Sequence, residues 1–296
     1  MEVLEKQKLT TTTAAMSAYW TLLKPRLSLL VVISTLLSFA YATDEVSYFS
    51  SLMLLGLFGF LITGAANACN QIIETELDAR MNRTRLRPMP TQAISQRDAL
   101  IFSIVLVGLG IFGIAWFFNL TASLLSFISF ALYVFIYTPL KPKTPLSVLI
   151  GAFPGALPIL VGCVAASGHF YPDYFILFGI QFFWQFPHFW AIAWVLDEDY
   201  QRAGFRLLPF GRDKDSTAAY YIFIYTVALV MVSLFPSFLQ LVGGWYTVIT
   251  AVAGLGFLLT TIFHMRQLSV ASARRVMFYS FFYLPIVQLL LALDKL

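Results

Sequence analysis

The chain is dominated by long apolar segments separated by short polar ones. A transmembrane helix needs about 20 consecutive, mostly apolar residues, because that length spans the hydrocarbon core of a bilayer. Counting such segments predicts an all-α, polytopic membrane protein with about nine transmembrane helices. The predicted spans are approximately residues 27–43, 50–72, 98–117, 120–138, 146–167, 173–195, 218–237, 242–264 and 276–293.

Composition agrees with this fold class. Hydrophobic residues make up 59% of the chain and charged residues 11%, whereas about a quarter of the residues of a soluble domain are charged. We therefore exclude a soluble globular protein. The two cysteines, Cys69 and Cys163, fall inside predicted spans without a metal-binding spacing. We expect them to be small packing residues.

The N-terminal residues differ from the rest of the chain. Residues 1–19 are polar and rich in threonine, and we expect a mobile tail followed by a single transmembrane domain over residues 20–296. Residues 14–24 predict a short helix at the membrane interface. The tail lacks the apolar core of a signal peptide, and its acids Glu2 and Glu5 are atypical of a mitochondrial transit peptide. A bacterial inner (plasma) membrane is therefore the expected location.

The distribution of basic residues predicts orientation. If the N-terminus is cytoplasmic, all 19 lysines and arginines except Lys295 fall in cytoplasmic segments, which is the arrangement that the positive-inside rule favours. The net charge of +4 then reflects topology. We expect no nucleic-acid partner, because no basic patch is interleaved with aromatic residues on a soluble domain.

The densest charge lies where the second predicted span reaches the cytoplasm. Glu74 and Asp78 are four residues apart, so a helix would place them on one face, with Asn70 one turn deeper. Two such carboxylates can share Mg²⁺, which also takes phosphate oxygens as ligands. The arginines that follow would bind such a phosphate. The alternative interpretation is an ordinary positive-inside loop with incidental acids.

A second polar segment follows the fourth predicted span. Residues 137–144 form a short, proline-containing cytoplasmic loop that offers Lys141, Lys143 and hydroxyl groups. These side chains could face the same phosphate as the arginines. The alternative is that both lysines only fix topology.

The sixth predicted span carries another group of polar residues. On a continuous helix, His188 and Asp199 share a face, because a separation of eleven residues completes about three turns. Gln185 lies one turn before His188 on the same face. The flanking Trp184 and Trp190 suggest the wall of a pocket. The alternative for His188 is a hydrogen-bonded packing residue.

A faint internal repeat connects the two acidic segments. A shift of 121 residues aligns Glu76 with Asp197 and Asp78 with Asp199. If both segments end helices that run in the same direction, the repeat places two acid-bearing helix ends across one site. Such a site would suit a pair of Mg²⁺ ions on a diphosphate.

Several short motifs in the chain are similar to a known signature. They are Asn70-x3-Glu74-x3-Asp78-x2-Met81-x-Arg83-Thr84-x2-Arg87-Pro88, Lys24-Pro25-Arg26, Tyr137-Thr138-x-Leu140-Lys141, Trp184-Gln185-x-Pro187-His188-Phe189-Trp190-Ala191 and Asp199-Tyr200-x3-Gly204. The first motif resembles the signature of the UbiA-type intramembrane prenyltransferases, and the others resemble the branch that farnesylates haem b. The chain departs from the family pattern at two places: Glu74 replaces the usual Asp, and Asp197-x-Asp199 replaces a second Asp-x3-Asp.

The resemblance implies a fold and a reaction. It implies a UbiA-type helical bundle that transfers the farnesyl group of farnesyl diphosphate to the 2-vinyl group of haem b. Addition of water gives haem O and diphosphate, for the biogenesis of haem-copper terminal oxidases. The alternatives are a related prenyltransferase acting on a quinone precursor or another tetrapyrrole, and a transporter that uses the acids as ion ligands.

The resemblance also implies roles for individual residues and partners. Implied partners are farnesyl diphosphate, haem b, membrane lipid, and haem A synthase or oxidase assembly factors. His188 is the candidate for orienting or ligating the porphyrin, or for handling a proton. The implied Mg²⁺ ligands are Glu74, Asp78, Asp197 and Asp199; the implied catalytic residues are Asn70, Glu74, Asp78, Arg83, Arg87 and His188; the implied substrate-binding residues are Lys141, Lys143, Gln185, Asp199 and Tyr200.

Overall fold

A computed structural model describes residues 15–43 and 48–296. Within these residues, nine helices are long and apolar enough to cross a membrane, and the predicted all-α fold class and span count are confirmed. The last span begins at Val270 instead of near residue 276, because Ser269 and Ser272 form a capping box there. The spans are α2 (Pro25–Ala42), α3 (Phe49–Ile73), α5 (Gln96–Phe117), the composite Leu120–Leu140, α8 (Ser147–Ser167), α9 (Pro172–Val195), α11 (Ser216–Phe238), α12 (Gly244–Gln267) and α13 (Val270–Leu293).

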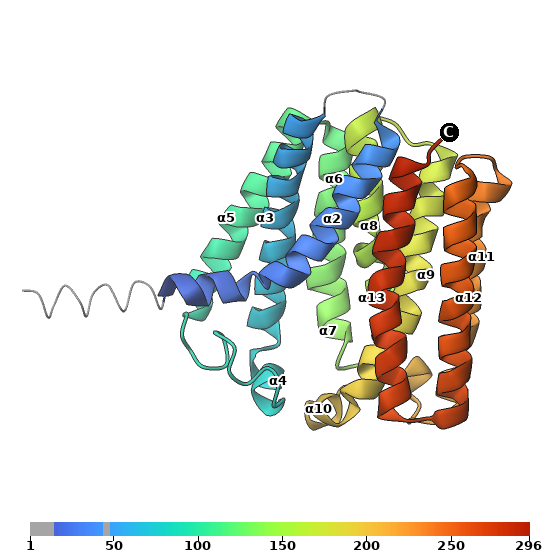
Figure 1. The fold of residues 1–296 in the computed structure, drawn as a ribbon. Helices are drawn as coiled ribbons and strands as arrows, with labels where there is room; N and C mark the ends of the chain where they lie inside the picture. Colours follow the sequence, from blue (N-terminus) through green and yellow to red (C-terminus); the bar gives the residue numbers. More distant parts are fainter. Residues whose placement is uncertain (1–14, 44–47) are drawn as a thin grey trace, which may run out of the picture.

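The predicted N-terminal tail is covered only in part. Residues 1–14 lie outside the described residues, whereas residues 15–22 are helical, where we expected a short helix. Figure 1 shows this short helix lying across the direction of the transmembrane helices. The chain then turns sharply at Lys24, and Pro25 opens α2.

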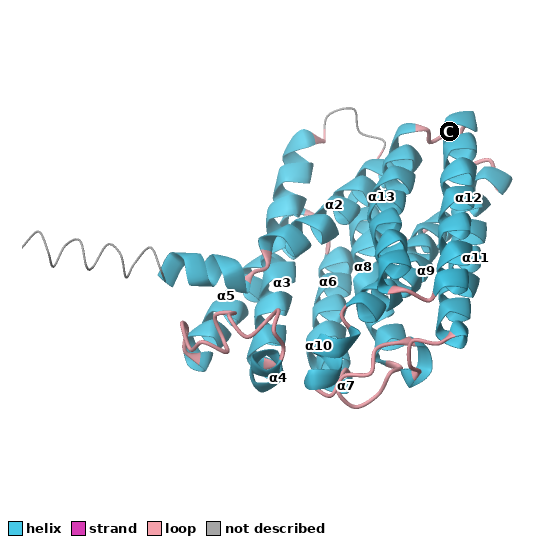
Figure 2. Cartoon of the chain, turned by 60° about the horizontal axis from the view of Figure 1, so that its bottom comes forward, coloured by secondary structure: helices cyan, strands magenta, loops and turns pink. Residues whose placement is uncertain are grey.

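The helices form two adjoining groups (Figure 1). Helices α2, α3, α5, α6 (Leu120–Ala131) and α8 make up the first, and α9, α11, α12 and α13 the second; α8 packs on α9 and α2 packs on α13. The short helices α4 (Thr75–Arg80), α7 (Thr138–Leu140) and α10 (Asp197–Arg202) lie at one end of the bundle, which faces the viewer in Figure 2. The polar segments found in the sequence are therefore gathered at that end.

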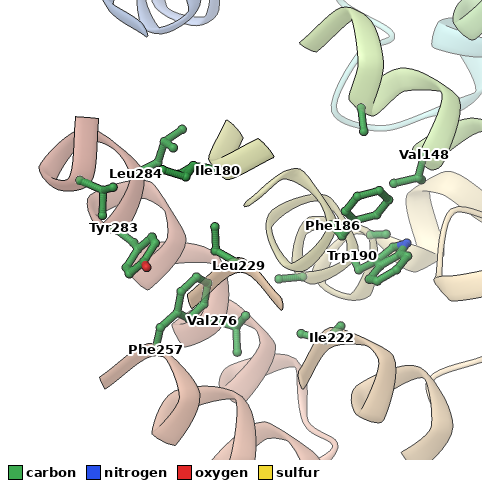
Figure 3. Packing of buried hydrophobic residues seen from close by; sticks show 14 of the residues in the cluster. Val148, Ile180, Phe186, Trp190, Ile222, Leu229, Phe257, Val276, Tyr283 and Leu284 are labelled. Carbon is green, nitrogen blue, oxygen red and sulfur yellow. The ribbon is translucent and has the colours of Figure 1, made fainter. Parts of the chain in front are cut away.

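Helix α9 is the centre of the second group. Its buried Phe186 and Trp190 pack against Tyr225 of α11, with ring centroids 4.5 and 5.0 Å away, and Figure 3 shows these side chains within the core. Trp190 is thus a core residue, and the expectation that it flanks a pocket beside His188 is wrong. The two tryptophans point differently because six residues separate them on a helix of 3.6 residues per turn.

A series of side-chain hydrogen bonds connects the two groups of helices inside the membrane-spanning region. Ser34 of α2 donates to Gln288 Oε1 of α13 at 2.9 Å, and Gln288 Nε2 donates to Gln181 Oε1 of α9 at 2.7 Å. Such interhelical bonds satisfy polar groups that water cannot reach in hydrocarbon. The amide side chains therefore act as cross-links between helices.

Helix α8 tolerates two internal prolines because a neighbour replaces a lost hydrogen bond. Pro158 has no N–H to donate to the carbonyl of Pro154, and Ser129 of α6 donates to that carbonyl instead, at 2.9 Å. Further along α8, Gly162 lies against the backbone carbonyl of Thr35 and the hydroxyl of Ser38 on α2. A side chain at position 162 would meet backbone atoms that cannot move aside.

We expect Gly162→Ala to destabilise the protein by about 1–3 kcal/mol, because the added methyl group forces α2 and α8 apart. Thermal unfolding of the detergent-solubilised protein, followed by tryptophan fluorescence, measures the effect. Gly108→Ala in α5 is the matched control, since nothing lies within 4 Å of a Cβ at that position. Equal unfolding midpoints for the two variants would contradict the close α2–α8 packing.

Candidate functional site

Two long helices break at equivalent points. Helix α3 ends at Ile73 and α4 follows after Glu74 (φ −91°, ψ 12°), while α9 ends at Val195 and α10 follows after Leu196 (φ −104°, ψ 15°). The two breaks, at Glu74 and Leu196, are 122 residues apart, whereas the repeat predicted a shift of 121 residues. By position relative to the breaks, Asp78 therefore corresponds to Tyr200 instead of Asp199.

The break at Leu196 also corrects the expected face of the sixth span. That expectation assumed one continuous helix from Gln185 to Asp199, whereas α10 is a separate helix. The acids explain the restart, because Asp197, Glu198 and Asp199 occupy the first turn of α10. Negative side chains there stabilise the positive end of the new helix dipole.

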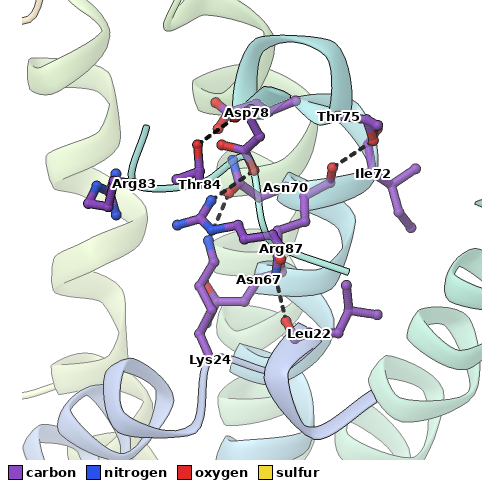
Figure 4. Close-up of polar contacts among 12 residues, drawn as sticks. Leu22, Lys24, Asn67, Asn70, Ile72, Thr75, Asp78, Arg83, Thr84 and Arg87 are labelled. Carbon is purple, nitrogen blue, oxygen red and sulfur yellow. Dashed lines mark hydrogen bonds and ion pairs between the residues drawn. The ribbon is translucent and has the colours of Figure 1, made fainter. Parts of the chain in front are cut away.

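The first acidic segment assembles into a compact polar cluster (Figure 4). Glu74 accepts two hydrogen bonds from Lys141 Nζ, both at 3.1 Å, and Asp78 Oδ2 accepts from Arg87 Nη1 at 2.8 Å. Asn70 accepts from Lys24 Nζ at 3.1 Å. We call these residues the inner cluster: Lys24, Asn70, Glu74, Asp78, Arg87 and Lys141.

Lys24 was not among the predicted site residues. Its backbone is left-handed (φ 47°), which turns its side chain back toward α3. The signal in the sequence was its position directly before Pro25, because a residue before proline is kept out of the α-helical region. Burial, and then the neighbouring Arg87, lower the pKa of Lys24 to about 7.

A π-helix positions the other lysine. Residues Leu132–Tyr137 have π-helical geometry, followed by α7. Thr138 Oγ1 donates to the carbonyl of Tyr133 at 2.9 Å and accepts from Asn70 Nδ2 at 3.3 Å. This wider turn places Lys141 beside Glu74. Turns of this kind occur often at functional sites.

The two carboxylates of the inner cluster are almost fully buried. The Glu74 side chain is 2% exposed and that of Asp78 is 1% exposed. Burial alone would lower the pKa of Lys141, but the adjacent Glu74 carboxylate more than compensates, and the net shift is upward. The charged form of Lys141 is therefore stabilised beside Glu74.

One carboxylate oxygen of Asp78 has no hydrogen-bond donor beside it among the described residues. Its Oδ1 atom is buried and has no hydrogen-bond partner within the described residues, an arrangement that is rare and costs free energy unless a ligand satisfies it. Among those residues no group of three or more His, Cys, Asp or Glu side chains is placed to hold a metal ion. Mg²⁺ needs only one or two protein carboxylates when phosphate and water complete its ligands. The free Oδ1 of Asp78 fits such an ion.

The second acidic segment has a different environment. Asp199 accepts the backbone N–H groups of Asn82 at 3.0 Å and Arg83 at 3.1 Å, and the side chain of Arg202 at 3.2 Å. Slight burial acts to raise the pKa of Asp199, but the two backbone N–H groups and the nearby arginines outweigh it, and the net shift is downward. Asp199 thus fastens the loop after α4 to α10.

Asp197 is half-buried and lies 3.5 Å from Lys214 Nζ. The loop around Lys214 therefore contributes an ion pair to this end of the bundle. Asp215 in the same loop caps α11 by accepting the N–H of Ala218 at 2.7 Å.

The remaining predicted substrate-binding residues are spread around the inner cluster. Lys141 Nζ also lies 4.7 Å from the ring of Phe205, which in turn contacts Tyr200. The side chains of Arg83 and Lys143 are exposed, and Arg83 lies to one side of the cluster in Figure 4. Gln185 Nε2 donates to the carbonyl of Ala152 at 2.9 Å, which joins α9 to α8.

His188 is buried and held on several sides. Its Nδ1 atom lies 2.8 Å from Ser280 Oγ of α13, its ring stacks on Trp184 at 4.3 Å, and Phe281 meets it edge-on at 4.7 Å. A second histidine, His264 of α12, is also fully buried. It bonds Ser272 at 2.9 Å, because the capping box extends α13 to that point.

The chain is similar to known proteins in family, sequence and structure. Residues 31–284 match the UbiA prenyltransferase family. The chain is 42% identical over 279 residues to the protoheme IX farnesyltransferase of Cytophaga hutchinsonii, covering 94% of this chain and 98% of that one. Among solved structures, it resembles a digeranylgeranylglyceryl phosphate synthase (TM-score 0.78, 20% identity, covering 95% of this chain and 98% of that one). It also resembles a UbiA homologue from Archaeoglobus fulgidus bound to GPP and Mg²⁺ (TM-score 0.67, 16% identity, 92% and 99% covered).

We expect Asp199→Asn to loosen the loop after α4, because a neutral amide with one acceptor oxygen cannot hold both N–H groups as a carboxylate does. Hydrogen–deuterium exchange should become faster at Asn82 and Arg83. Asp197→Asn is the matched control, since Asp197 bonds Gln201 and Lys214 and does not bond this loop. Unchanged exchange in Asp199→Asn would contradict the assigned contacts.

Proposed function

The chain belongs to the UbiA prenyltransferase family, and we propose that it transfers the farnesyl group of farnesyl diphosphate to the 2-vinyl group of haem b. The bond between farnesyl C1 and the diphosphate oxygen breaks, and C1 bonds to the terminal vinyl carbon. Water adds its oxygen to the other vinyl carbon and releases a proton, which gives haem O and diphosphate. The observation that carries this proposal is the inner cluster, where three basic side chains surround two buried carboxylates. The similarity to a protoheme IX farnesyltransferase supports the choice of substrates.

The basic residues of the inner cluster would bind the diphosphate. Lys24, Arg87 and Lys141 approach from the start of α2, the loop after α4 and the end of α7. Their charges are held in place by Asn70, Asp78 and Glu74, so little reorganisation is needed when the leaving group gains charge. Exposed Arg83 extends the same basic surface toward the solvent.

We infer that the site uses a divalent metal ion, with Mg²⁺ as the candidate. The buried, unpartnered Oδ1 of Asp78 supports this inference, as does the fold shared with the Mg²⁺-bound Archaeoglobus fulgidus homologue. Mg²⁺ would neutralise the diphosphate as it leaves. Asp78 is the residue that would hold it. The other three implied ligands are not gathered around one ion, because Glu74 is bonded to Lys141, Asp197 to Lys214, and Asp199 to the backbone of the loop after α4.

The apolar part of the bundle suits the other half of the reaction. An allylic cation is stabilised by aromatic faces, and a site sealed from bulk water protects it from premature capture. Trp184 and Phe281 contact the His188 ring where α13 packs on α9. We infer that His188 orients or ligates the porphyrin at this position.

We propose that the inner cluster faces the cytoplasm of a bacterial cell and that the bundle lies in its inner membrane. The end that carries α4, α7 and α10 also carries most of the basic loop residues, as the positive-inside rule expects of a cytoplasmic side. Farnesyl diphosphate would reach the cluster from that side, and haem b from the lipid. Haem O would then pass to haem A synthase or to oxidase assembly factors.

The test is to incubate purified protein with haem b, farnesyl diphosphate and Mg²⁺ and to search for haem carrying a hydroxyfarnesyl group by mass spectrometry. We expect this product, and its loss when the metal is chelated. Release of diphosphate with a quinone precursor or another tetrapyrrole, but not with haem b, would overturn the choice of acceptor. No diphosphate release on any acceptor would favour a transporter.

We expect Asp78→Asn and Arg87→Ala to reduce turnover by at least about 10²-fold, because each removes a charge from the inner cluster. Turnover is measured with saturating substrates and Mg²⁺, and membrane insertion should be unchanged. The matched controls are Glu76→Gln and Arg85→Ala, whose side chains are exposed nearby. Wild-type rates in Asp78→Asn or Arg87→Ala would remove these residues from the mechanism.

Lys24 predicts a pH dependence of anion binding. With its pKa lowered to about 7, the free lysine gains its proton as the pH falls through 7 and loses it as the pH rises. Without divalent metal, affinity for inorganic diphosphate should therefore weaken between pH 6 and pH 8.5 more in the wild type than in Lys24→Met. Isothermal titration calorimetry measures this difference, and the comparison cancels titration of diphosphate itself. Identical pH profiles for the two proteins would contradict a titrating Lys24.

A further inference from the structure

The hydrogen bonds around Ser280 determine the protonation pattern of His188. Ser280 Oγ lies 2.6 Å from the carbonyl of Met277, to which it donates. A serine hydroxyl has one proton, so the same oxygen can only accept in its 2.8 Å contact with His188 Nδ1. The proton of a neutral His188 is therefore on Nδ1, and its Nε2 atom carries a free lone pair.

Ser280 also fixes the surroundings of the imidazole. Its backbone carbonyl accepts the indole N–H of Trp184 at 2.7 Å, and Trp184 stacks on the His188 ring with an interplanar angle of 17°. Phe281, the next residue of α13, contacts the other side of the ring nearly perpendicularly, at 83°. One short segment of α13 thus sets both the tautomer and the orientation of His188.

Histidine 264 provides an internal comparison. Its Nδ1 atom also lies 2.9 Å from a serine hydroxyl, that of Ser272, but this hydroxyl has several further contacts with Ser269 and does not fix the tautomer of His264. His264 Nε2 is fully enclosed without a partner among the described residues, so no ligand can reach it. The Nε2 of His188 is not among those enclosed atoms. The two histidines therefore differ in access.

We propose that Ser280 is a positioning residue that presents His188 Nε2 as an axial ligand for the iron of haem b. Metal-ligating histidines usually donate their other N–H to an oxygen, which fixes the tautomer and strengthens the ligand, and loss of that oxygen typically weakens metal affinity or activity 10- to 100-fold. Nothing in this arrangement binds diphosphate, so its role concerns only the acceptor substrate. The inference rests on haem b being that acceptor.

The first test needs no substrate. The chain has 3 histidines, so protein labelled with ¹⁵N in the histidine rings gives few signals, which His169→Gln and His264→Gln assign. We expect wild-type His188 to be protonated on Nδ1, and Ser280→Ala to move most of that proton to Nε2. Ser280→Thr, which keeps the hydroxyl, should retain the wild-type pattern. A wild-type His188 protonated on Nε2 would overturn the proposal.

The second test measures the iron ligand directly. Ferric haem b should bind about 10- to 100-fold more weakly to Ser280→Ala than to the wild type. In the ferrous protein, the iron–histidine stretching band should move to lower frequency when Nδ1–H loses its acceptor. Ser272→Ala is the matched control, because it should change the ¹⁵N signals of His264 and leave the haem spectra unchanged. A purely structural Ser280 would change stability without shifting this band.

These measurements separate the two proposals. Formation of haem O by a wild-type protein whose bound haem has no histidine ligand would overturn the role of Ser280 and leave the proposed function intact. A histidine-ligated haem that responds to Ser280→Ala, without any farnesylated product, would overturn the proposed function and leave the positioning role intact.

Discussion

The site depends on the burial of two carboxylates at the end of a transmembrane helix. A charged group removed from water is unfavourable unless it is paired. The chain pairs Asp78 with Arg87 of the loop after α4, and Glu74 with Lys141, which lies beyond α5 and α6 in the sequence. The inner cluster therefore forms only when the first group of helices is folded. Stability and the proposed substrate binding rely on the same contacts.

The helix breaks at Glu74 and Leu196 serve this arrangement. A continuous α3 would carry Asp78 straight out of the bundle, whereas the break lets α4 turn and bury it under the following loop. At the second break, α10 turns so that Asp199 meets the backbone of that loop. The repeat thus supplies two helix ends with different tasks. One carries the buried charges, and the other holds the loop that covers them.

The sequence predicted what depends on local pattern. The nine spans follow from segment length and hydrophobicity, and the grouping of Asn70, Glu74 and Asp78 follows from their four-residue spacing, which survives the break because the N–H of Asp78 still bonds the carbonyl of Glu74. Lys141 was predicted to face the same phosphate as the arginines. Its bond to Glu74 was not predicted, because its position is set by a π-helix that has no local sequence pattern.

What the sequence missed depends on contacts between distant segments. Lys24 is separated from Asn70 by 46 residues and Ser280 from His188 by 92, so no periodicity within one helix could pair them. The prediction that the polar face of α9 continues beyond Val195 was wrong for a related reason. A helical wheel assumes an uninterrupted helix, and the three acids after Leu196 favour starting a new one.

The charges of the inner cluster bear on how the site accepts a substrate. In the Glu74–Lys141 and Asp78–Arg87 ion pairs, the positive and negative charges cancel. The lowered pKa of Lys24 allows this lysine to be neutral near pH 7. In the proposed reaction, an arriving diphosphate would favour the charged lysine, and a divalent cation on Asp78 Oδ1 would offset the charge of the diphosphate. Diphosphate and cation would therefore bind more favourably together than separately. The buried pairs hold the cluster neutral without them, which is how charged residues at the edge of a bilayer can be stable before the substrate arrives.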